Sequence, residues 1–253
     1  MTSQTTTQAG MTGTVALVTG GSRGIGAATA VRLAREGADV ALTYVRDKDA
    51  ADDVVGRIRA LGRRALALRA DSADADEASA AVERAAEGLG GLDVLVNNAG
   101  VGLLGPIESL SLADIDRVLA VNVRGVFLAS RAAAARMGPG GRIITIGTCM
   151  TQRVPGPGGT LYATGKSALV GLTKALAREL GERGITANIV HPGPIDTDMN
   201  PADGPYAAGQ AAMTAVGRFG TADEVASAVA YLAGAEAAYV TGAEFSVDGG
   251  HAA

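Results

Sequence analysis

The chain has 253 residues, 47% of them hydrophobic and 3% aromatic, with 36 glycines and a formal net charge of −4. This length suits one large domain, and many glycines with few aromatics favour helices packed closely on a sheet over a β-sandwich. The net negative charge and the scattered Lys and Arg residues disfavour nucleic-acid binding. The single cysteine, Cys149, excludes an internal disulfide and disfavours a metal site built from thiolates, so we expect no metal.

The first ten residues are rich in Thr and Gln and lack the basic start and apolar centre of a signal peptide. We predict a disordered tail over residues 1–10, followed by one domain over residues 11–253. No apolar run approaches the roughly 18 residues that a membrane helix needs. We therefore expect a cytoplasmic protein with no membrane partner.

Short apolar runs alternate with segments of helical periodicity along the chain. We predict strands at 14–19, 39–43, 65–68, 93–96, 142–146, 185–190 and 244–247. We predict helices at 25–36, 50–61, 74–89, 115–136, 161–180 and 222–232. Strands that alternate with helices imply parallel pairing through right-handed crossovers. The predicted fold class is α/β: a Rossmann-type doubly wound parallel sheet of about seven strands, flanked by helices on both faces.

One long segment follows neither pattern. Residues 198–217 are irregular and polar, and they lie between the last predicted buried strands. Long irregular segments in compact domains often cover active sites. We expect this segment to be a mobile lid over a substrate pocket.

The segment from Thr19 to Gly26 follows the first predicted strand and opens the first predicted helix. Gly20, Gly24 and Gly26 permit positive φ or close backbone approach, and a helix N-terminus offers unpaired N–H groups to a pyrophosphate. An ordinary glycine-rich turn would have a similar sequence. Its position in the first strand–helix unit favours dinucleotide binding.

The end of the second predicted strand bears on which dinucleotide binds. An NAD enzyme commonly places a carboxylate there to hold the ribose, but this chain has Tyr44 and no acid before Asp47. Arg23 and Arg46 are cations that could meet a 2′-phosphate, although either alone could be a solvated surface residue. Together with the missing acid they predict NADPH, with NADH less favoured.

Tyr162 and Lys166 are four residues apart and therefore share a helix face. A phenol titrates near pH ~10 in water, and a nearby cation would lower that pKa towards useful acid–base strength. The same spacing also occurs by chance in surface pairs. The pair alone leaves both interpretations open.

Taken together, these motifs resemble the short-chain dehydrogenase/reductase (SDR) family. They stand in the family's order from about residue 14 to residue 250: the glycine loop, Asn97-Asn98-Ala99-Gly100, Asn122, Tyr162-Ala163-Thr164-Gly165-Lys166 and Pro192-Gly193. The chain resembles bacterial 3-oxoacyl-(acyl carrier protein) reductases. Through residues 196–205 it also resembles SDR-type biofilm-dispersal mediators that bind cyclic di-GMP.

The resemblance implies roles for the matching residues. The catalytic set would be Asn122, Thr148, Tyr162 and Lys166, with Asn122 binding a water that passes protons to Lys166. The cofactor would contact Gly20, Ser22, Arg23, Gly24, Ile25, Gly26, Tyr44, Arg46, Asp71, Ser72, Asn98, Ala99, Gly100, Tyr162, Lys166, Pro192, Gly193, Ile195 and Thr197.

Within that set, Asp71 would hydrogen-bond the adenine, and the segment from Pro192 to Ile195 would line the nicotinamide with Thr197 near its carboxamide. Each has another possible explanation: Asp71 and Thr197 could cap helices, and Asn98 could be a turn residue. His191, at a strand end, is interpreted as structural or as support for the site from behind.

The chain departs from the family pattern at two places. Where a serine usually holds the substrate carbonyl, the interval to Tyr162 selects Cys149 while the strand exit Ile146-Gly147 selects Thr148. We choose Thr148, because a hydroxyl donates a better hydrogen bond than a thiol. Gly165 replaces the usual serine or alanine, at a cost of about 1 kcal/mol against alanine in a helix.

The predicted function is NADPH-dependent reduction of a ketone or 3-oxoacyl carbonyl, with Tyr162 as general acid and a small carbonyl or alcohol as substrate. The alternative is a nucleotide- or ligand-binding regulatory protein, which would not need the complete Asn-Thr-Tyr-Lys set. Family helices that match residues 132–135 and 161–180 pack between subunits, which implies a homotetramer or homodimer. Lys174, Arg178 and Arg183 could form a docking patch for an acyl carrier or be ordinary surface charges.

Overall fold

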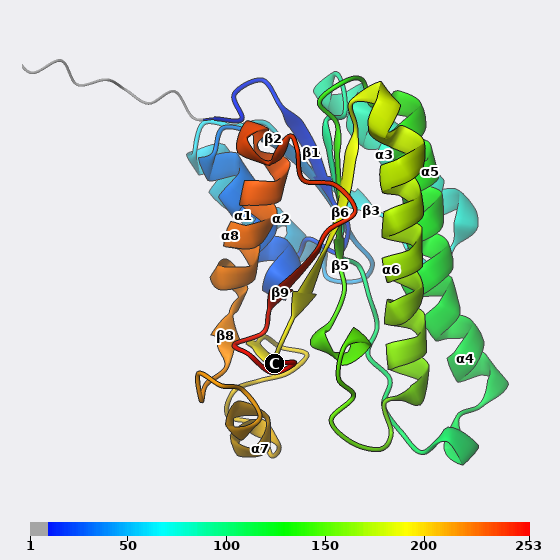
Figure 1. Ribbon diagram of the computed structural model, residues 1–253. Coiled ribbons are helices and arrows are strands. Elements are labelled where there is room, and N and C mark those ends of the chain that lie inside the picture. Colours follow the sequence, from blue (N-terminus) through cyan, green and yellow to red (C-terminus); the bar gives the residue numbers. More distant parts are fainter. Residues whose placement is uncertain (1–9) are drawn as a thin grey trace, which may run out of the picture.

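The computed structural model describes residues 10–253, so the predicted tail lies outside the described residues except for Gly10. Seven parallel strands form one sheet in the order β3-β2-β1-β4-β5-β6-β9 (Figure 1). Their bounds are β1 Val15–Val18, β2 Asp39–Tyr44, β3 Ala65–Arg69, β4 Val94–Asn97, β5 Arg142–Ile146, β6 Thr186–Pro192 and β9 Glu244–Val247. The prediction of a doubly wound parallel sheet is confirmed.

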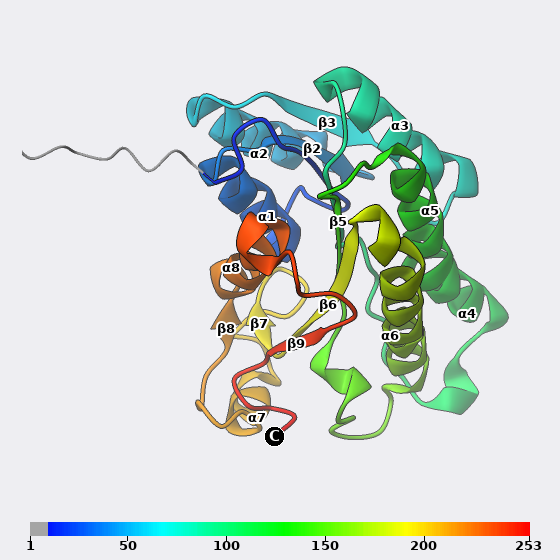
Figure 2. The same cartoon turned by 45° about the horizontal axis from the view of Figure 1, so that its top comes forward.

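Helices cover both faces of this sheet, as Figures 1 and 2 show. One layer contains α1 Gly24–Arg35, α2 Lys48–Ala60 and α8 Ala222–Ala233. The other contains α3 Ala75–Leu89, α4 Leu112–Leu119, α5 Val126–Arg136 and α6 Thr160–Leu180. The chain winds from β1 out to β3 and then restarts at β4 on the other side of β1. In such sheets ligands bind at the carboxyl ends of the strands beside this reversal.

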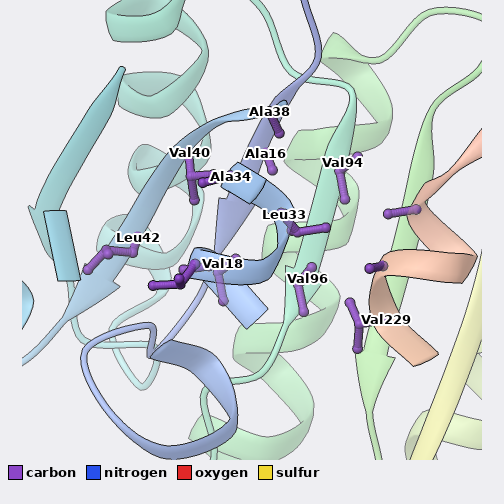
Figure 3. Close-up of a cluster of buried hydrophobic side chains, with 14 of the residues drawn as sticks. Ala16, Val18, Leu33, Ala34, Ala38, Val40, Leu42, Val94, Val96 and Val229 are labelled. Atoms are coloured by element: carbon purple, nitrogen blue, oxygen red, sulfur yellow. The ribbon is translucent and has the colours of Figure 1, made fainter. Parts of the chain in front are cut away.

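The strand side chains alternate between two separate cores. Ala16 and Val18 of β1 pack with Leu33 of α1 and Val96 of β4 in one cluster (Figure 3). Leu17, the residue between them in β1, belongs to the cluster on the opposite face. Because successive residues of a strand point to opposite faces, strands buried on both sides must be apolar throughout. This explains the short unbroken apolar runs in the sequence.

The helix predicted over residues 115–136 consists of three parts. A capping box between Ser111 and Asp114 begins α4, residues Ala120–Gly125 form a π-helical turn, and α5 follows directly. By length and apolar composition, the stretch Leu112–Arg136 would suffice to cross a membrane, with 44% of its most apolar window buried. We interpret it as a core helix, because α5 packs on α3 and α4 packs on α6.

The segment predicted to be an irregular lid contains regular structure. It holds the six-residue helix α7, Ala207–Ala212, and is flanked by β7 Ile195–Asp196 and β8 Gly220–Thr221, which pair in parallel. The side-chain amides of Asn200 and Gln210 donate to each other at 2.8 and 3.1 Å. These contacts between residues that are not adjacent in sequence give the segment its structure, and the periodicity of the sequence does not reveal them.

Candidate active site

The glycine loop shapes the junction of β1 and α1. Gly20 and Gly24 have φ values of 62° and 52°, a region that favours glycine. A Cβ on Gly26 would lie 2.3 Å from the carbonyl oxygen of Gly20 and 2.5 Å from Nδ2 of Asn98. No side chain caps the start of α1, so its first N–H groups face the loop. This cradle fits the pyrophosphate of a dinucleotide.

Asn98 holds this loop in place from the end of β4. Its amide Nδ2 donates to the carbonyl oxygens of Thr19 and Gly20, each at 2.9 Å. The hydroxyl of Thr19 accepts the main-chain N–H groups of Asn98 and Ala99 at 3.0 Å. The Asn98 amide nitrogen is therefore occupied by the loop, and Thr19 is a supporting residue that the sequence analysis did not single out.

The end of β2 lies beside a group of charged residues. Tyr44 is half-buried at the end of the strand, and Arg46 is exposed just beyond it. Asp47, the first acid in this region, is the N-cap of α2 and accepts the N–H of Ala50 at 2.9 Å. That carboxylate is therefore used by the helix, while Arg46 is exposed beside the end of β2.

Asp71 follows β3 and lies near Arg46. Its carboxylate accepts the N–H of Ala73 at 2.9 Å and Nη1 of Arg117 at 3.1 Å. Partial burial acts to raise the pKa of Asp71, but these two hydrogen bonds and the nearby arginines hold it below its usual value. The Asp71 carboxylate is thus charged and already bonded to Ala73 and Arg117, and the nearby charge of Arg46 also lowers its pKa.

Lys166 is buried on α6 and directed towards β5. Its ammonium donates a 2.7 Å hydrogen bond to the carbonyl oxygen of Ile146, and burial lowers the pKa of Lys166 to about 8. A Cβ on Gly100 would lie 3.3 Å from this ammonium and 3.4 Å from Oδ1 of Asn122. The ends of β4 and β5, the π-helical turn and α6 therefore meet at one point. A buried, perturbed lysine of this kind is typical of functional sites.

Asn122 is fully buried within the π-helical turn. Its Oδ1 accepts the N–H of Val101 and its Nδ2 donates to the carbonyl oxygen of Val101, both at 2.9 Å. Both ends of the side chain are thus occupied by Val101. A water relay at this position would have to use the main chain of the turn, where the helical hydrogen-bond pattern is broken.

Thr148 and Tyr162 face each other across the site. Thr148 is buried where the chain leaves β5, and Tyr162 is half-buried on the first turn of α6, with its hydroxyl among buried groups. Burial raises the pKa of Tyr162, and a hydrogen bond with Thr148 partly opposes that rise. The helical spacing predicted that Lys166 would lower this pKa. In this structure the pKa of Tyr162 is raised instead, because burial is the largest influence on it and the Lys166 ammonium donates to Ile146.

Cys149, the other candidate for the Thr148 position, is buried beside it. Burial raises the pKa of its thiol to about 11, so the thiol is neutral near pH 7. A neutral thiol is a poor nucleophile and a weak hydrogen-bond donor. The geometry therefore favours Thr148 as the donor near Tyr162.

The segment predicted to line the nicotinamide closes the site from the β6 side. A Cβ on Gly193 would lie 2.6 Å from Cα of Asp248, so Pro192 and Gly193 pass close to the C-terminal turn. Cγ2 of Thr197 would lie 3.3 Å from a Cβ on Gly24. Thr197 therefore lies against the glycine loop.

Ser72 lies close to the π-helical turn. A Cβ on Gly125 of that turn would lie 2.3 Å from the Ser72 carbonyl oxygen.

A family model described as enoyl-(acyl carrier protein) reductase matches residues 11–252. Relatives and solved structures that match along nearly the whole chain carry dehydrogenase and reductase names. The chain belongs to the short-chain dehydrogenase/reductase family. The SDR resemblance derived from its motifs is confirmed.

Three SDR relatives illustrate the range of likeness. The cyclic-di-GMP-binding biofilm dispersal mediator protein of Escherichia coli (strain K12) is 46% identical over 94% of this chain and 97% of its own. A 3-oxoacyl-[acyl-carrier-protein] reductase of a Synechocystis species is 40% identical over 95% and 97%. The crystal structure of a short chain dehydrogenase from Burkholderia cenocepacia J2315 in complex with NADP has a TM-score of 0.95 and 55% identity, covering 96% and 100%.

Proposed function

We propose that this SDR oxidoreductase is an NADPH-dependent carbonyl reductase acting on a small ketone or 3-oxoacyl compound. The observation that carries the proposal is that the hydroxyls of Thr148 and Tyr162 lie close enough to influence each other beside the buried Lys166. Bound NADPH would supply the hydride. The protein's task is then to hold the carbonyl oxygen and to give it a proton.

Tyr162 suits the role of proton donor. Since burial raises its pKa, the phenol is protonated near neutral pH and can donate to the alkoxide as that charge forms. The Thr148 hydroxyl would hold the same oxygen, and Lys166 would hold the end of β5 beside it through its hydrogen bond to Ile146. Asn122 would fix the π-helical turn that lies against Lys166.

Tyr162→Phe tests this mechanism, because it removes the proton donor and leaves the ring. NADPH oxidation would be measured with a panel of ketones, β-ketoesters and 3-oxoacyl thioesters. We expect nearly all turnover to disappear while NADPH binding, measured by fluorescence, survives. Substantial turnover by Tyr162→Phe on every ketone that the wild type reduces would refute the mechanism.

The preference for NADPH rests on the turn after β2. Arg23 and Arg46 are exposed beside it, while the carboxylate of Asp47 is occupied as the cap of α2. The related Burkholderia enzyme was crystallised with NADP. Arg46→Ala should raise the KM for NADPH and leave NADH use nearly unchanged. Tighter binding of NADH than of NADPH by the wild type would overturn the assignment.

The contacts of Lys174, Arg178 and Arg183 bear on whether they form a docking patch for an acyl carrier protein or are ordinary surface charges. Lys174 pairs with Glu244 at 2.7 Å, and Arg183 donates to the carbonyl oxygens of Ala134 and Met137 at the end of α5. Of the three candidates, Arg178 alone has neither an ion pair nor a side-chain hydrogen bond among residues 10–253. We therefore propose a free small-molecule carbonyl or alcohol as the substrate, rather than one delivered by a carrier.

Regulatory nucleotide binding is the second candidate function, favoured by the 46% identity to a protein named as cyclic-di-GMP-binding. Calorimetric titration with cyclic di-GMP, with and without NADPH, would test it. Binding in the range of micromolar Kd that survives Tyr162→Phe would support this function, since the phenol serves only catalysis. Absence of binding would leave reduction as the single proposal.

We also propose a cytoplasmic homotetramer or homodimer. Large apolar side chains on α4 and α5 are exposed, with Leu112 at 72% and Phe127 at 54%. Exposed large apolar side chains on consecutive helices are groups that an interface between subunits would bury. Light scattering at several protein concentrations would measure the assembly, and a monomer at all of them would refute it.

A further inference from the structure

His191 is fully buried at the carboxyl end of β6 and faces the loop that carries Thr148. The main-chain N–H of Thr148 donates to Nδ1 of the imidazole at 3.3 Å, and the hydroxyl of Thr151 lies 3.2 Å from the same nitrogen. Because a main-chain N–H can only donate, Nδ1 must be the acceptor. The neutral ring then carries its proton on Nε2.

The other ring nitrogen connects His191 to the surface. Nε2 lies 3.2 Å from Oε2 of Glu244 on β9, and Oε1 of the same carboxylate accepts the ammonium of Lys174 at 2.7 Å. The side chains of Lys174 and Glu244 are 57% and 27% exposed. A chain of polar contacts thus leads from solvent through Glu244 and His191 to the main chain of Thr148.

Gly147 makes room for this arrangement. A Cβ at Gly147 would lie 2.5 Å from Nδ1 and 2.8 Å from Cε1 of the His191 ring. Gly147 is not among the described glycines with positive φ, so its backbone conformation would accept other residues. Glycine is needed here because the His191 ring lies so close. Any side chain at this position would push the imidazole away from Thr148.

We propose that His191, oriented by Glu244, is a positioning residue that aims the hydroxyl of Thr148 at the substrate carbonyl. The inference rests on the proposed carbonyl reduction. Thr148 is β-branched and has few side-chain rotamers, so the direction of its hydroxyl follows the main chain. The imidazole fixes that main chain where it leaves β5, which keeps Thr148 opposite Tyr162. His191 itself does not touch the reacting atoms.

The neutral form of His191 is the one that can do this. Protonation at Nδ1 would set two N–H donors against each other and release Thr148. Burial lowers the pKa of His191, the bonded carboxylate of Glu244 and the main chain of Thr148 raise it, and the buried ammonium of Lys166 lowers it. Behind Glu244 lies Lys174, whose charge reaches the ring only through that carboxylate.

Two surface substitutions should therefore move the acid limb of the kcat profile in opposite directions. Glu244→Gln removes a charge that raises the pKa of His191, so turnover should persist to lower pH. Lys174→Met leaves the charge of Glu244 uncompensated, so the acid limb should move to higher pH. Glu236→Gln and Arg178→Met, at exposed positions, are the matched controls and should leave the limb unchanged.

Substitutions at the ring itself separate positioning from general damage. His191→Leu and Gly147→Ala should lower kcat by about 10- to 100-fold, the range expected for a misplaced catalytic group. The affinity for NADPH should stay at the wild-type value. His191→Asn should recover most of kcat, because its amide oxygen can accept the Thr148 N–H in place of Nδ1. A folded His191→Asn as slow as His191→Leu would overturn the proposal.

A spectroscopic readout is independent of turnover. The sequence contains two histidines, so ¹⁵N labelling of the imidazoles gives two ring systems, which His251→Gln would assign. We expect His191 to be neutral with its proton on Nε2 at pH 7, and the Thr148 amide resonance to shift with the same pKa. A charged ring or a proton on Nδ1 would overturn the geometry. If the wild type reduces no carbonyl, the proposed function fails, but the ¹⁵N measurement still shows whether His191 accepts the Thr148 N–H.

Discussion

The burial of Lys166 predicts a specific dependence of stability on pH. Burial lowers its pKa from 10.5 to about 8, and at 1.36 kcal/mol per unit this difference of roughly 2.5 units disfavours the folded state by about 3 kcal/mol at neutral pH. The unfolded chain binds this proton more tightly than the folded one. Stability must therefore rise with pH between about 8 and 10.5, because there the unfolded state holds more protons.

Lys166→Met isolates this effect, since Met has a similar shape and does not titrate. Urea unfolding of both proteins at about pH 7 and about pH 9.5 should show the wild type gaining about 2 kcal/mol relative to the variant. Comparing the pair cancels the titration of all other groups, and it cancels the fixed cost of losing the bond to Ile146. Lys174→Met, with a side chain 57% exposed, is the control. A difference between wild type and Lys166→Met that is constant with pH would refute the argument that burial penalises this charge.

Gly165→Ala should stabilise α6 by up to about 1 kcal/mol, seen as a higher Tm with activity retained. Its Cβ would lie 3.6 Å from the nearest atoms, which is ordinary contact. Gly26→Ala should instead abolish NADPH binding in a fluorescence titration, because its Cβ would lie 2.3 Å from a carbonyl oxygen. At the end of β5, Thr148→Ala should lower kcat, Thr148→Ser should preserve or widen activity, and Cys149→Ala should be nearly silent. An inactive Cys149→Ala beside an active Thr148→Ala would transfer the role to the thiol.

Local patterns in the sequence were enough to predict the fold. Unbroken apolar runs such as that of β1 specify strands buried on both faces, and their alternation with helices specifies parallel pairing. Gly20, Gly24 and Gly26 could be singled out because a glycine requirement depends on the backbone of a few neighbouring residues. The spacing of Tyr162 and Lys166 placed both on one face of α6 because helical geometry is periodic.

The direction of each polar side chain was decided by tertiary structure. Lys166 donates to a carbonyl 20 residues away, Asn122 pairs with a main chain 21 residues away, and His191 accepts an N–H from 43 residues away. Local spacing predicted that Lys166 would lower the pKa of Tyr162, but the nearest acceptor for the ammonium lies on β5. Such contacts depend on which strands are neighbours and on their register. Periodicity along a single segment carries no information about register, so these bonds, and the burial that shifts each pKa, arise only when the sheet and its helices assemble.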